Sequence, residues 1–415
     1  MKLAIIGSGI SGLTAAFYLH KIHDISVFEK GDYVGGHTNT INMSLSDGMY
    51  PVDTGFIVHN DRTYPNFIKL LKHLDVQTQD TEMSFSVKDE VSGLEYNGGN
   101  LNKIFAQRSN LLRPRFYLLL REILRFNATA KDFLLENDSS LSLGDFLKRY
   151  QFSEMFMDKY LVPMGASIWS TVPSDMLKYP ADAFLSFFLN HGLLDLQNRP
   201  QWRTIQGGSR EYVKKITSGF QDRIHLNQNI QAVDRLNSGT YVHFDNGEKE
   251  RFDGVILATH SDQALQILNK PSPEERRILS AIPYQKNVAI LHTDAQVLPK
   301  RRLAWASWNY HLTESSTAVA ALTYNMNILQ DLKTKEVVNV TLNHKAAIDP
   351  NKIHAEIIYH HPLFTQAGIS AQKEKHLISG VNNTWFCGAF WRHGFHEDGV
   401  VSALDVVKQL GGTPL

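Results

Sequence analysis

Short apolar runs and one amphipathic segment alternate at the start of the chain. Lys2–Ile6 has the length and composition of a buried parallel strand, and residues 13–19 have helical spacing. A second apolar run, Ile25–Phe28, follows. Between the first strand and the helix lies Gly7-Ser8-Gly9-Ile10-Ser11-Gly12, a G-x-G-x-x-G turn. This order predicts a βαβ unit with a glycine-rich connection.

Farther along, the pattern predicts one long helix and then alternating strands. Residues 116–136 carry apolar side chains at helical spacing, and a shorter helix is expected at 64–74. Ser142 is expected to cap the helix that follows it, and Pro163, Pro173 and Pro180 to break helices into short pieces. A last helix is expected from about Gly399 to Leu410. Expected strands are 84–87, 94–96, 224–233, 241–244, 254–258, 288–292, 303–308, 318–324, 338–342 and 384–387.

Composition narrows the class of protein. The chain has 415 residues, of which 43% are hydrophobic and 20% charged, as in globular proteins with a sizeable core. Basic and acidic residues number 42 each, so no net charge favours nucleic acid. The single cysteine, Cys387, excludes an intrachain disulfide framework and paired-cysteine metal sites, which fits the cytoplasm. No apolar run is long enough to predict a transmembrane helix.

The glycine turn predicts a dinucleotide site. Gly7 permits the tight turn, Gly9 lets the backbone approach a pyrophosphate, and Gly12 lets the helix pack closely on the strand. The helix start offers free N–H groups and a positive dipole end to the phosphates. Glu29 ends the second strand, where a carboxylate accepts hydrogen bonds from both hydroxyls of an adenosine ribose. It would repel a 2′-phosphate, which argues against NADP.

Motifs beyond the turn resemble those of flavoproteins. Glu29-Lys30 is followed by Gly35-Gly36, then by Asp53-Thr54-Gly55. Near the end, Phe386-Cys387-Gly388 precedes Gly399-x-x-x-Ala403. With these motifs the chain resembles the FAD-dependent amine oxidase superfamily, which also contains phytoene desaturases and protoporphyrinogen oxidases. The resemblance implies an FAD enzyme, and it covers essentially the full length.

Four further segments resemble a narrower group within that superfamily. These are 385–390, 394–399, 340–343 and 359–362. The group consists of flavoproteins often encoded beside cyclopropane-fatty-acid-synthase-like methyltransferases. The resemblance therefore implies a lipid substrate and such a methyltransferase as a partner.

The resemblance also implies a domain organisation of the α/β class. Residues 1–75, 205–265 and 370–415 are expected to form a discontinuous, GR2-type Rossmann-like FAD-binding domain. Residues 76–204 and 266–369 are expected to form an α+β substrate domain with an antiparallel sheet. A simple dehydrogenase, in contrast, keeps its dinucleotide domain contiguous.

Cofactor contacts follow from the motifs and from the family. His37 stands where many relatives have arginine, and an imidazole is the less reliable phosphate ligand. Cys387 lacks the motif of covalent flavin attachment, so noncovalent FAD is expected. The family counterpart of Val233 touches the adenine. The expected FAD-binding residues are Gly7, Gly9, Ile10, Ser11, Gly12, Glu29, Lys30, Gly36, His37, Thr38, Gly55, Phe56, Val233, Gly388, Asp398, Gly399, Val400 and Ala403.

Catalytic groups are harder to assign. His396 is the candidate acid or base beside the flavin, because imidazole titrates near working pH. The alternative is an orienting hydrogen bond within its loop. His393 lies three residues away, but the pair lacks further ligands, so no metal is expected. His360-His361-Pro362 is expected to form a structural turn.

Two apolar segments bear on the substrate. Residues 113–125 are basic and aromatic, which fits a helix on the inner face of a membrane or a helix packed on its own core. Phe184, Phe187 and Phe188 fit an apolar channel or ordinary core. The predicted function is hydride transfer on an unsaturated or methyl-branched fatty acyl lipid. The alternatives are an amine oxidase that releases hydrogen peroxide and a non-catalytic flavin-binding partner of a lipid methyltransferase.

Overall fold

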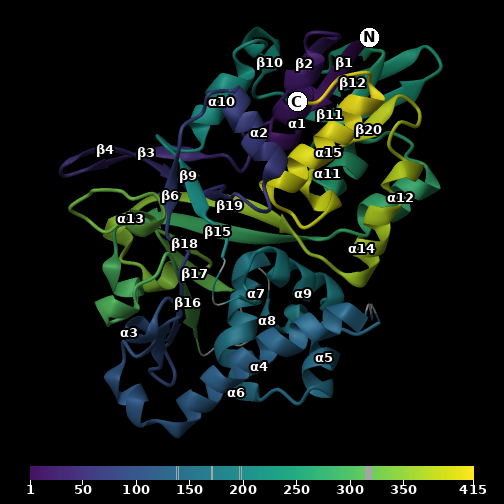
Figure 1. Cartoon of the computed structure of the whole chain (residues 1–415). Helices are drawn as coiled ribbons and strands as arrows, with labels where there is room; N and C mark the ends of the chain where they lie inside the picture. Colours follow the sequence, from purple (N-terminus) through teal and green to yellow (C-terminus); the bar gives the residue numbers. More distant parts are fainter. Residues whose placement is uncertain (137, 139, 170–171, 196, 198, 314–319) are drawn as a thin grey trace.

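Three tiers of secondary structure make up the molecule (Figure 1). The computed structural model describes every residue except 137, 139, 170–171, 196, 198 and 314–319. A parallel sheet with its helices lies at the end where both termini meet, a large mixed sheet lies in the middle, and a helical layer covers the opposite end. The predicted α/β class is confirmed.

The first tier is a five-stranded parallel sheet. Alternate residues of its central strand, β1 (Lys2–Ile6), face opposite cores: Leu3 and Ile5 contact one hydrophobic cluster, Ala4 and Ile6 another. The first cluster includes α1 (Ile10–Leu19) and α15 (His396–Gln409). The second includes the antiparallel strands β11 (Ile230–Leu236), β12 (Gly239–Phe244) and β13 (Lys249–Phe252). The sheet order is β10 (Ile224–His225), β2 (Asp24–Phe28), β1 (Lys2–Ile6), β14 (Gly254–Leu257) and β20 (Thr384–Phe386).

The middle tier is a seven-stranded sheet, antiparallel as expected except for one parallel pair, β16 with β7. The expected strand 303–308 is wrong: Arg302–Ala304 forms a 3₁₀ turn and β16 starts at Trp308. The Asn309 amide bonds the backbone N–H and C=O of Ala306, which offers that segment an alternative to a strand ladder. The order is β19 (Ile353–Pro362), β15 (Tyr284–His292), β18 (Asn339–Leu342), β17 (Ala321–Asn325), β16 (Trp308–Leu312), β7 (Phe85–Asp89) and β8 (Glu95–Asn97).

Strand β19 corrects a second expectation. His360, His361 and Pro362 end this strand instead of forming a turn, and they pair with Lys286, Gln285 and Tyr284 of β15. β19 is an edge strand of the sheet, where proline is tolerated at the strand end. The pairing carries both histidines to the boundary between the first and second tiers.

The third tier is built around phenylalanines. Phe126, Phe146, Phe156, Phe184 and Phe188 are all fully buried in one cluster. Its helices are α3 (Leu101–Ile104), α4 (Pro114–Glu136), α5 (Leu143–Arg149), α6 (Glu154–Phe156), α7 (Val162–Trp169), α8 (Pro173–Met176) and α9 (Ala181–Asn190).

Capping and proline positions in this tier follow local rules with one exception. Ser142 caps α5 as expected, since its hydroxyl accepts the N–H of Asp145 at 3.1 Å. Pro173 and Pro180 stand at helix starts. Pro163, in contrast, lies inside a continuous helical run. The π-helical turn Met157–Leu161 precedes it and already departs from the regular hydrogen-bond ladder that proline would interrupt.

The Asp53 carboxylate connects three segments that are far apart in the sequence. Asp53 ends the hairpin of β3 (Thr40–Leu45) and β4 (Gly48–Asp53), and its carboxylate accepts bonds from Thr40 Oγ1 at 2.6 Å and Ser209 Oγ at 2.8 Å. Gln330 Nε2 donates to it at 3.1 Å. These contacts fix the Gly208 turn beside a small sheet of β5 (Val58–Asn60), β9 (Trp202–Ile205) and β6 (Thr78–Thr81).

Candidate functional site

One cavity connects all three tiers. Its volume is about 1440 Å³, and its wall runs from the glycine turn through the middle sheet to the helical layer. Pockets for a single drug-sized ligand usually measure roughly 300–1,000 Å³. The cavity is therefore large enough for a dinucleotide and a second ligand, placed end to end.

The glycine turn has the geometry that a pyrophosphate requires. Gly7 has φ +104°, and a Cβ there would lie 2.7 Å from the Ala258 carbonyl oxygen. Gly9 borders the cavity, and a Cβ added to it would meet no atom within 4 Å. That open space lies in front of the N-terminus of α1, where free N–H groups bind anions. Gly36, with φ +59°, closes against the Gly9 backbone from the other side.

Glu29 is held in place before any ligand arrives. One carboxylate oxygen accepts the Ser8 N–H at 2.9 Å and the Ser8 hydroxyl at 2.6 Å, and the other accepts the Gly31 N–H at 2.8 Å. The carboxylate borders the cavity beside the glycine turn. Its remaining lone pairs suit the two hydroxyls of an adenosine ribose, so these residues fit the adenosine half of FAD.

The C-terminal segment reaches the cavity earlier than expected. Helix α15 begins at His396, so the cavity wall contains Phe395 and His396 and not the start predicted at Gly399. The Asp398 carboxylate accepts the Phe395 N–H at 2.9 Å and caps the helix. A Cβ at Gly399 would lie 2.7 Å from Ile10 Cγ2, so this glycine permits close packing of α15 on α1.

The predicted cofactor residues thus divide into two sets. Val233 is fully buried away from the cavity, whereas Ile230, three residues earlier on the same strand, borders it. We therefore propose Ile230 in place of Val233 at the adenine. Predicted residues on the cavity wall are Gly7, Gly9, Ile10, Ser11, Glu29, Lys30, Gly36, His37, Gly55, Phe56, Gly388 and His396. Predicted residues behind the wall are Gly12, Thr38, Val233, Asp398, Gly399, Val400 and Ala403.

A wall of histidines lies beside the glycine turn, and only His37 of it was predicted as a cofactor residue. The His37 ring lies 5.4 Å from that of His361 and 6.3 Å from that of His260. Tyr359 stacks on His37 at 4.9 Å, and Tyr284 stacks on His260 at 4.4 Å. All five side chains border the cavity. His37, His260 and His361 lie on separate segments of the chain, so sequence spacing carries no signal of their meeting.

Burial keeps this histidine wall neutral. It lowers the pKa of His37 to about 3, with His260 and His360 as further causes. It also lowers the pKa of His361 to about 3 and that of His260 to about 4. The wall therefore offers neutral imidazoles to an incoming ligand.

His396 belongs to a different buried group. Its Nε2 lies 3.0 Å from both Thr38 Oγ1 and Tyr212 OH, and those two hydroxyls lie 2.5 Å apart. Phe56 stacks on the ring at 3.5 Å. Burial holds the His396 pKa well below its ordinary value, and any positive charge on His37 or His59 would lower it further. This geometry favours an orienting hydrogen bond over proton transfer as the role of His396.

A family model that matches most of the chain shows which family the chain belongs to. The family model for flavin containing amine oxidoreductases matches residues 10–342. The chain belongs to this family. Members of this family bind a flavin, and we propose that the glycine turn, Glu29 and the cavity form the flavin site of this chain.

Individual proteins and solved structures are also similar to this chain. An L-amino acid oxidase of Bothrops pictus is 22% identical over 306 residues, which are 70% of this chain and 59% of the oxidase. Cyclohexylamine oxidase from Brevibacterium oxydans IH-35A has the same fold, with a TM-score of 0.70, 15% identity and 99% coverage of both chains. A CLA-producing fatty acid isomerase from P. acnes gives a TM-score of 0.66 at 15% identity, with 98% of both chains covered. The chain thus spans less than two thirds of the curated oxidase.

Cys387 does not reach the flavin site. The thiol is fully buried in the first tier and is absent from the cavity wall. Burial raises its pKa to about 12. Noncovalent FAD is consistent with this position.

Beyond the flavin end, the cavity is predominantly apolar. Trp202 of β9 and Phe187 of α9 border it, and so do Tyr160, Met164 and Ile168, which share one face of a helical run at spacings of four residues. The aromatic residues of α9 divide between two roles, since Phe187 borders the cavity while Phe184 and Phe188 are core. Among the described residues, the cavity wall contains one carboxylate, Glu29, at the adenosine end.

A group of possible metal ligands lies outside this cavity. His311 Nδ1 and His344 Nε2 each lie 3.7 Å from a Glu90 oxygen. The Asp294 N–H donates to His292 Nδ1, so the proton of the neutral His292 ring is on Nε2. From there a chain of hydrogen bonds runs through the hydroxyls of Thr341 and Thr323 to His311 Nε2. That chain leaves the His311 proton on Nδ1, facing Glu90, and Lys88 lies 3.7 Å from the same carboxylate. Burial lowers the pKa of His311 to about 4, so a neutral imidazole N–H and Lys88 face this carboxylate, which does not suit a bound cation.

Proposed function

We propose that the chain is an FAD-dependent oxidoreductase that acts on a fatty acyl lipid. The observation that carries the proposal is the apolar half of the cavity, which continues from the flavin end into the helical layer. An unsaturated or methyl-branched acyl chain matches a long apolar wall with few polar groups. The fatty acid isomerase of the same fold is a precedent for this substrate class.

The charges of the wall support a neutral or anionic substrate over a cationic one. An alkylammonium group would meet no carboxylate in the apolar half among the described residues, because Glu29 lies at the opposite end. Arg199, in contrast, borders the cavity. Burying an unpaired ammonium is costly, whereas a carboxylate or phosphate would find a cation there.

Some residues of the cavity would bind the cofactor, and others would exclude water from the reacting atoms. FAD, when bound, supplies hydride transfer with the substrate. The Gly9 backbone and Glu29 hold its pyrophosphate and adenosine. Ile168 and Phe187 keep water from the reacting carbons, and His396 orients the ring end through its fixed hydrogen bonds. A proton released from the substrate would leave the site for water, because burial holds the His396 pKa well below its ordinary value and makes this imidazole a weak base.

Amine oxidation is the second candidate, and family membership favours it. The two are separated by anaerobic mixing of the purified protein with a panel of phospholipids, fatty acids and amines, followed by the visible absorbance of the flavin. A redox change with unsaturated or methyl-branched acyl lipids, and none with amines, is expected. Reduction by amines alone, with hydrogen peroxide released in air, would overturn the lipid proposal.

A lipid methyltransferase partner stays a prediction of the sequence. If the chain only supports such an enzyme, the two proteins co-purify and no substrate changes the redox state of the flavin. The same anaerobic panel, repeated with the methyltransferase present, tests that outcome.

A further inference from the structure

We propose that residues 101–125 form a docking surface for a membrane that carries anionic phospholipid. This docking surface comprises α3, the 3₁₀ turn Arg108–Leu112 and the first half of α4. It lies at the end of the molecule opposite the nucleotide-binding sheet (Figure 1). The inference rests on the proposed function only for the identity of the ligand that enters the cavity.

Large apolar side chains are unusually exposed on the docking surface. Leu112 is 88% exposed and Leu101 is 74% exposed. Single exposed apolar residues are common, but a concentration of them marks an interaction site. The further exposed members are Leu111, Tyr117, Leu118 and Leu124.

The charge of the docking surface is strongly positive. Residues 101–125 contain six basic residues and one acidic residue, although the whole chain carries equal numbers of both. The acidic one, Glu122, is already bonded to Arg125 and Ser153. Arg115 and Arg121 make no hydrogen bond or ion pair with any described residue. Apolar side chains flanked by free cations are the composition of helices that lie in a membrane interface.

A groove gathers Arg115 and Arg121 with two further arginines that already have partners, and Glu122 also lines it. Its volume is about 910 Å³, and four arginines border it together with Leu118. The four are Arg113, Arg115, Arg121 and Arg125, all exposed. Guanidinium groups bind phosphate oxygens in a fork, so the groove suits lipid phosphates next to inserted leucines.

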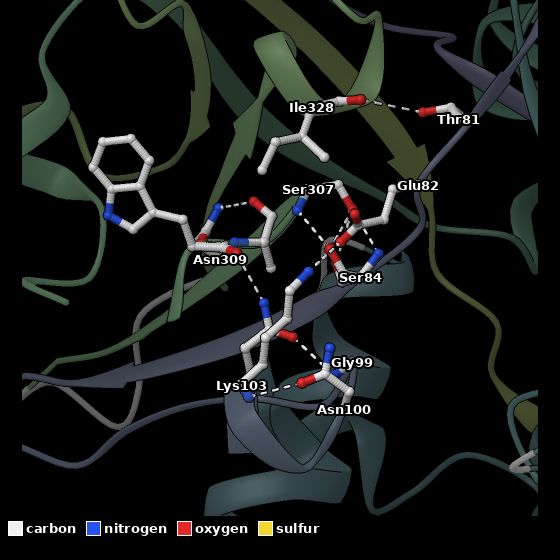
Figure 2. A network of polar contacts seen from close by, with 12 residues as sticks. Thr81, Glu82, Ser84, Gly99, Asn100, Lys103, Ser307, Asn309 and Ile328 are labelled. Carbon is white, nitrogen blue, oxygen red and sulfur yellow. Dashed lines mark hydrogen bonds and ion pairs between the residues drawn. The ribbon is translucent and has the colours of Figure 1, made fainter. Parts of the chain in front are cut away.

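The substrate cavity opens on the same surface. Leu101 and Leu124 are exposed to solvent and also border the cavity, so one opening of the cavity lies between α3 and α4. Polar contacts hold α3 against the segment that leads into β7, as Figure 2 shows. Lys103 Nζ pairs with Glu82 at 3.0 Å, and the Asn100 side chain accepts the Lys103 N–H at 3.0 Å. An acyl chain can therefore pass from the bilayer into the cavity without crossing water.

Co-sedimentation with vesicles tests the inference. We expect the purified FAD-loaded protein to sediment with phosphatidylcholine vesicles that contain phosphatidylglycerol, and much less with phosphatidylcholine alone or at high salt. Each basic residue near an anionic surface contributes about 1 kcal/mol, so R115Q/R121Q should weaken partitioning about 30-fold. L111S/L112S should weaken it at every salt concentration.

Matched controls are available on the first tier. Leu236 is 56% exposed and Arg276 is exposed, and both lie outside the docking surface. L236S and R276Q should therefore bind vesicles as the wild type does. Absence of binding to anionic vesicles, or equal binding by R115Q/R121Q and the wild type, would overturn the inference. So would a wild-type dimer that L111S/L112S converts to monomer, since a second copy would then cover the surface.

Failure of the inference and failure of the proposed function give different results. Lipid supplied in detergent micelles reaches the cavity without a bilayer. If docking is wrong and the substrate is right, micellar lipid still changes the flavin and vesicles do not bind. If the substrate is wrong and docking is right, vesicles bind and no lipid changes the flavin.

Discussion

Gly9→Ala should separate two properties of the glycine turn, namely its contribution to folding stability and its contribution to FAD binding. Gly9 has φ −68° and ψ 179°, values that alanine adopts freely, and its added Cβ would meet no atom within 4 Å. Alanine reduces the entropy of the unfolded chain by about 0.4–1 kcal/mol, and its weaker N-capping costs a similar amount. The free energy of unfolding of the apoprotein should therefore change by less than about 1 kcal/mol.

The same methyl group should weaken FAD binding. It projects into the space where the pyrophosphate approaches the start of α1. Loss of one hydrogen bond to a charged group costs about 1.5–3 kcal/mol, which raises the Kd for FAD roughly 10- to 150-fold. Flavin fluorescence titration gives the Kd, and urea denaturation of the apoprotein gives the stability.

Gly7→Ala is the matched control for this prediction. A Cβ at Gly7 would lie 2.7 Å from the Ala258 oxygen at a φ of +104°, so this variant should lose folding stability by about 1–3 kcal/mol. The reasoning is refuted if Gly9→Ala binds FAD as the wild type does, or if it destabilises the apoprotein as much as Gly7→Ala.

Two other predictions concern the two ends of the cavity. Ile168→Trp should fill the apolar half of the cavity, lower kcat/KM for an acyl lipid at least tenfold and leave the Kd for FAD unchanged. Steady-state kinetics and a flavin titration measure the two quantities. Unaltered kinetics would show that Ile168 does not line the path of the substrate. The histidine wall should make the apoprotein acid-sensitive, because His37 and His361 have folded pKa values of about 3 and His260 of about 4. Unfolded histidines titrate near pH 6.5, so the unfolded state binds more protons below that pH, and stability should fall by up to about 1.4 kcal/mol per pH unit per histidine as the pH drops from 6.5 toward 4. Urea denaturation across that range measures how steeply the free energy of unfolding falls with pH, and His37→Asn should make this fall less steep. A free energy of unfolding that does not change with pH would contradict the burial of neutral histidines.

Local patterns sufficed for the parts of the fold that depend on nearby residues. The strand Lys2–Ile6 and the Ser142 cap agree with the structure because adjacent residues determine them. The break expected at Pro163 failed because a π-helical turn precedes that proline. The strand expected at 303–308 failed because the Asn309 side chain bonds the backbone of Ala306.

The site was predictable where one motif contains it. Gly9 and Glu29 lie close in sequence, and both border the cavity. The histidine wall was not predictable, since β15 and β19 must pair before His361 approaches His37. Long-range strand register brings these groups together, and a single sequence carries little information about it.

Anaerobic mixing of the FAD-loaded protein with an acyl lipid tests the central claim most directly. With FAD at the glycine turn and an acyl chain in the apolar half of the same cavity, unsaturated or methyl-branched lipids should change the redox state of the flavin. Ile168→Trp should abolish the change. A protein that does not take up FAD, or a flavin that amines reduce and lipids leave unchanged, would contradict it.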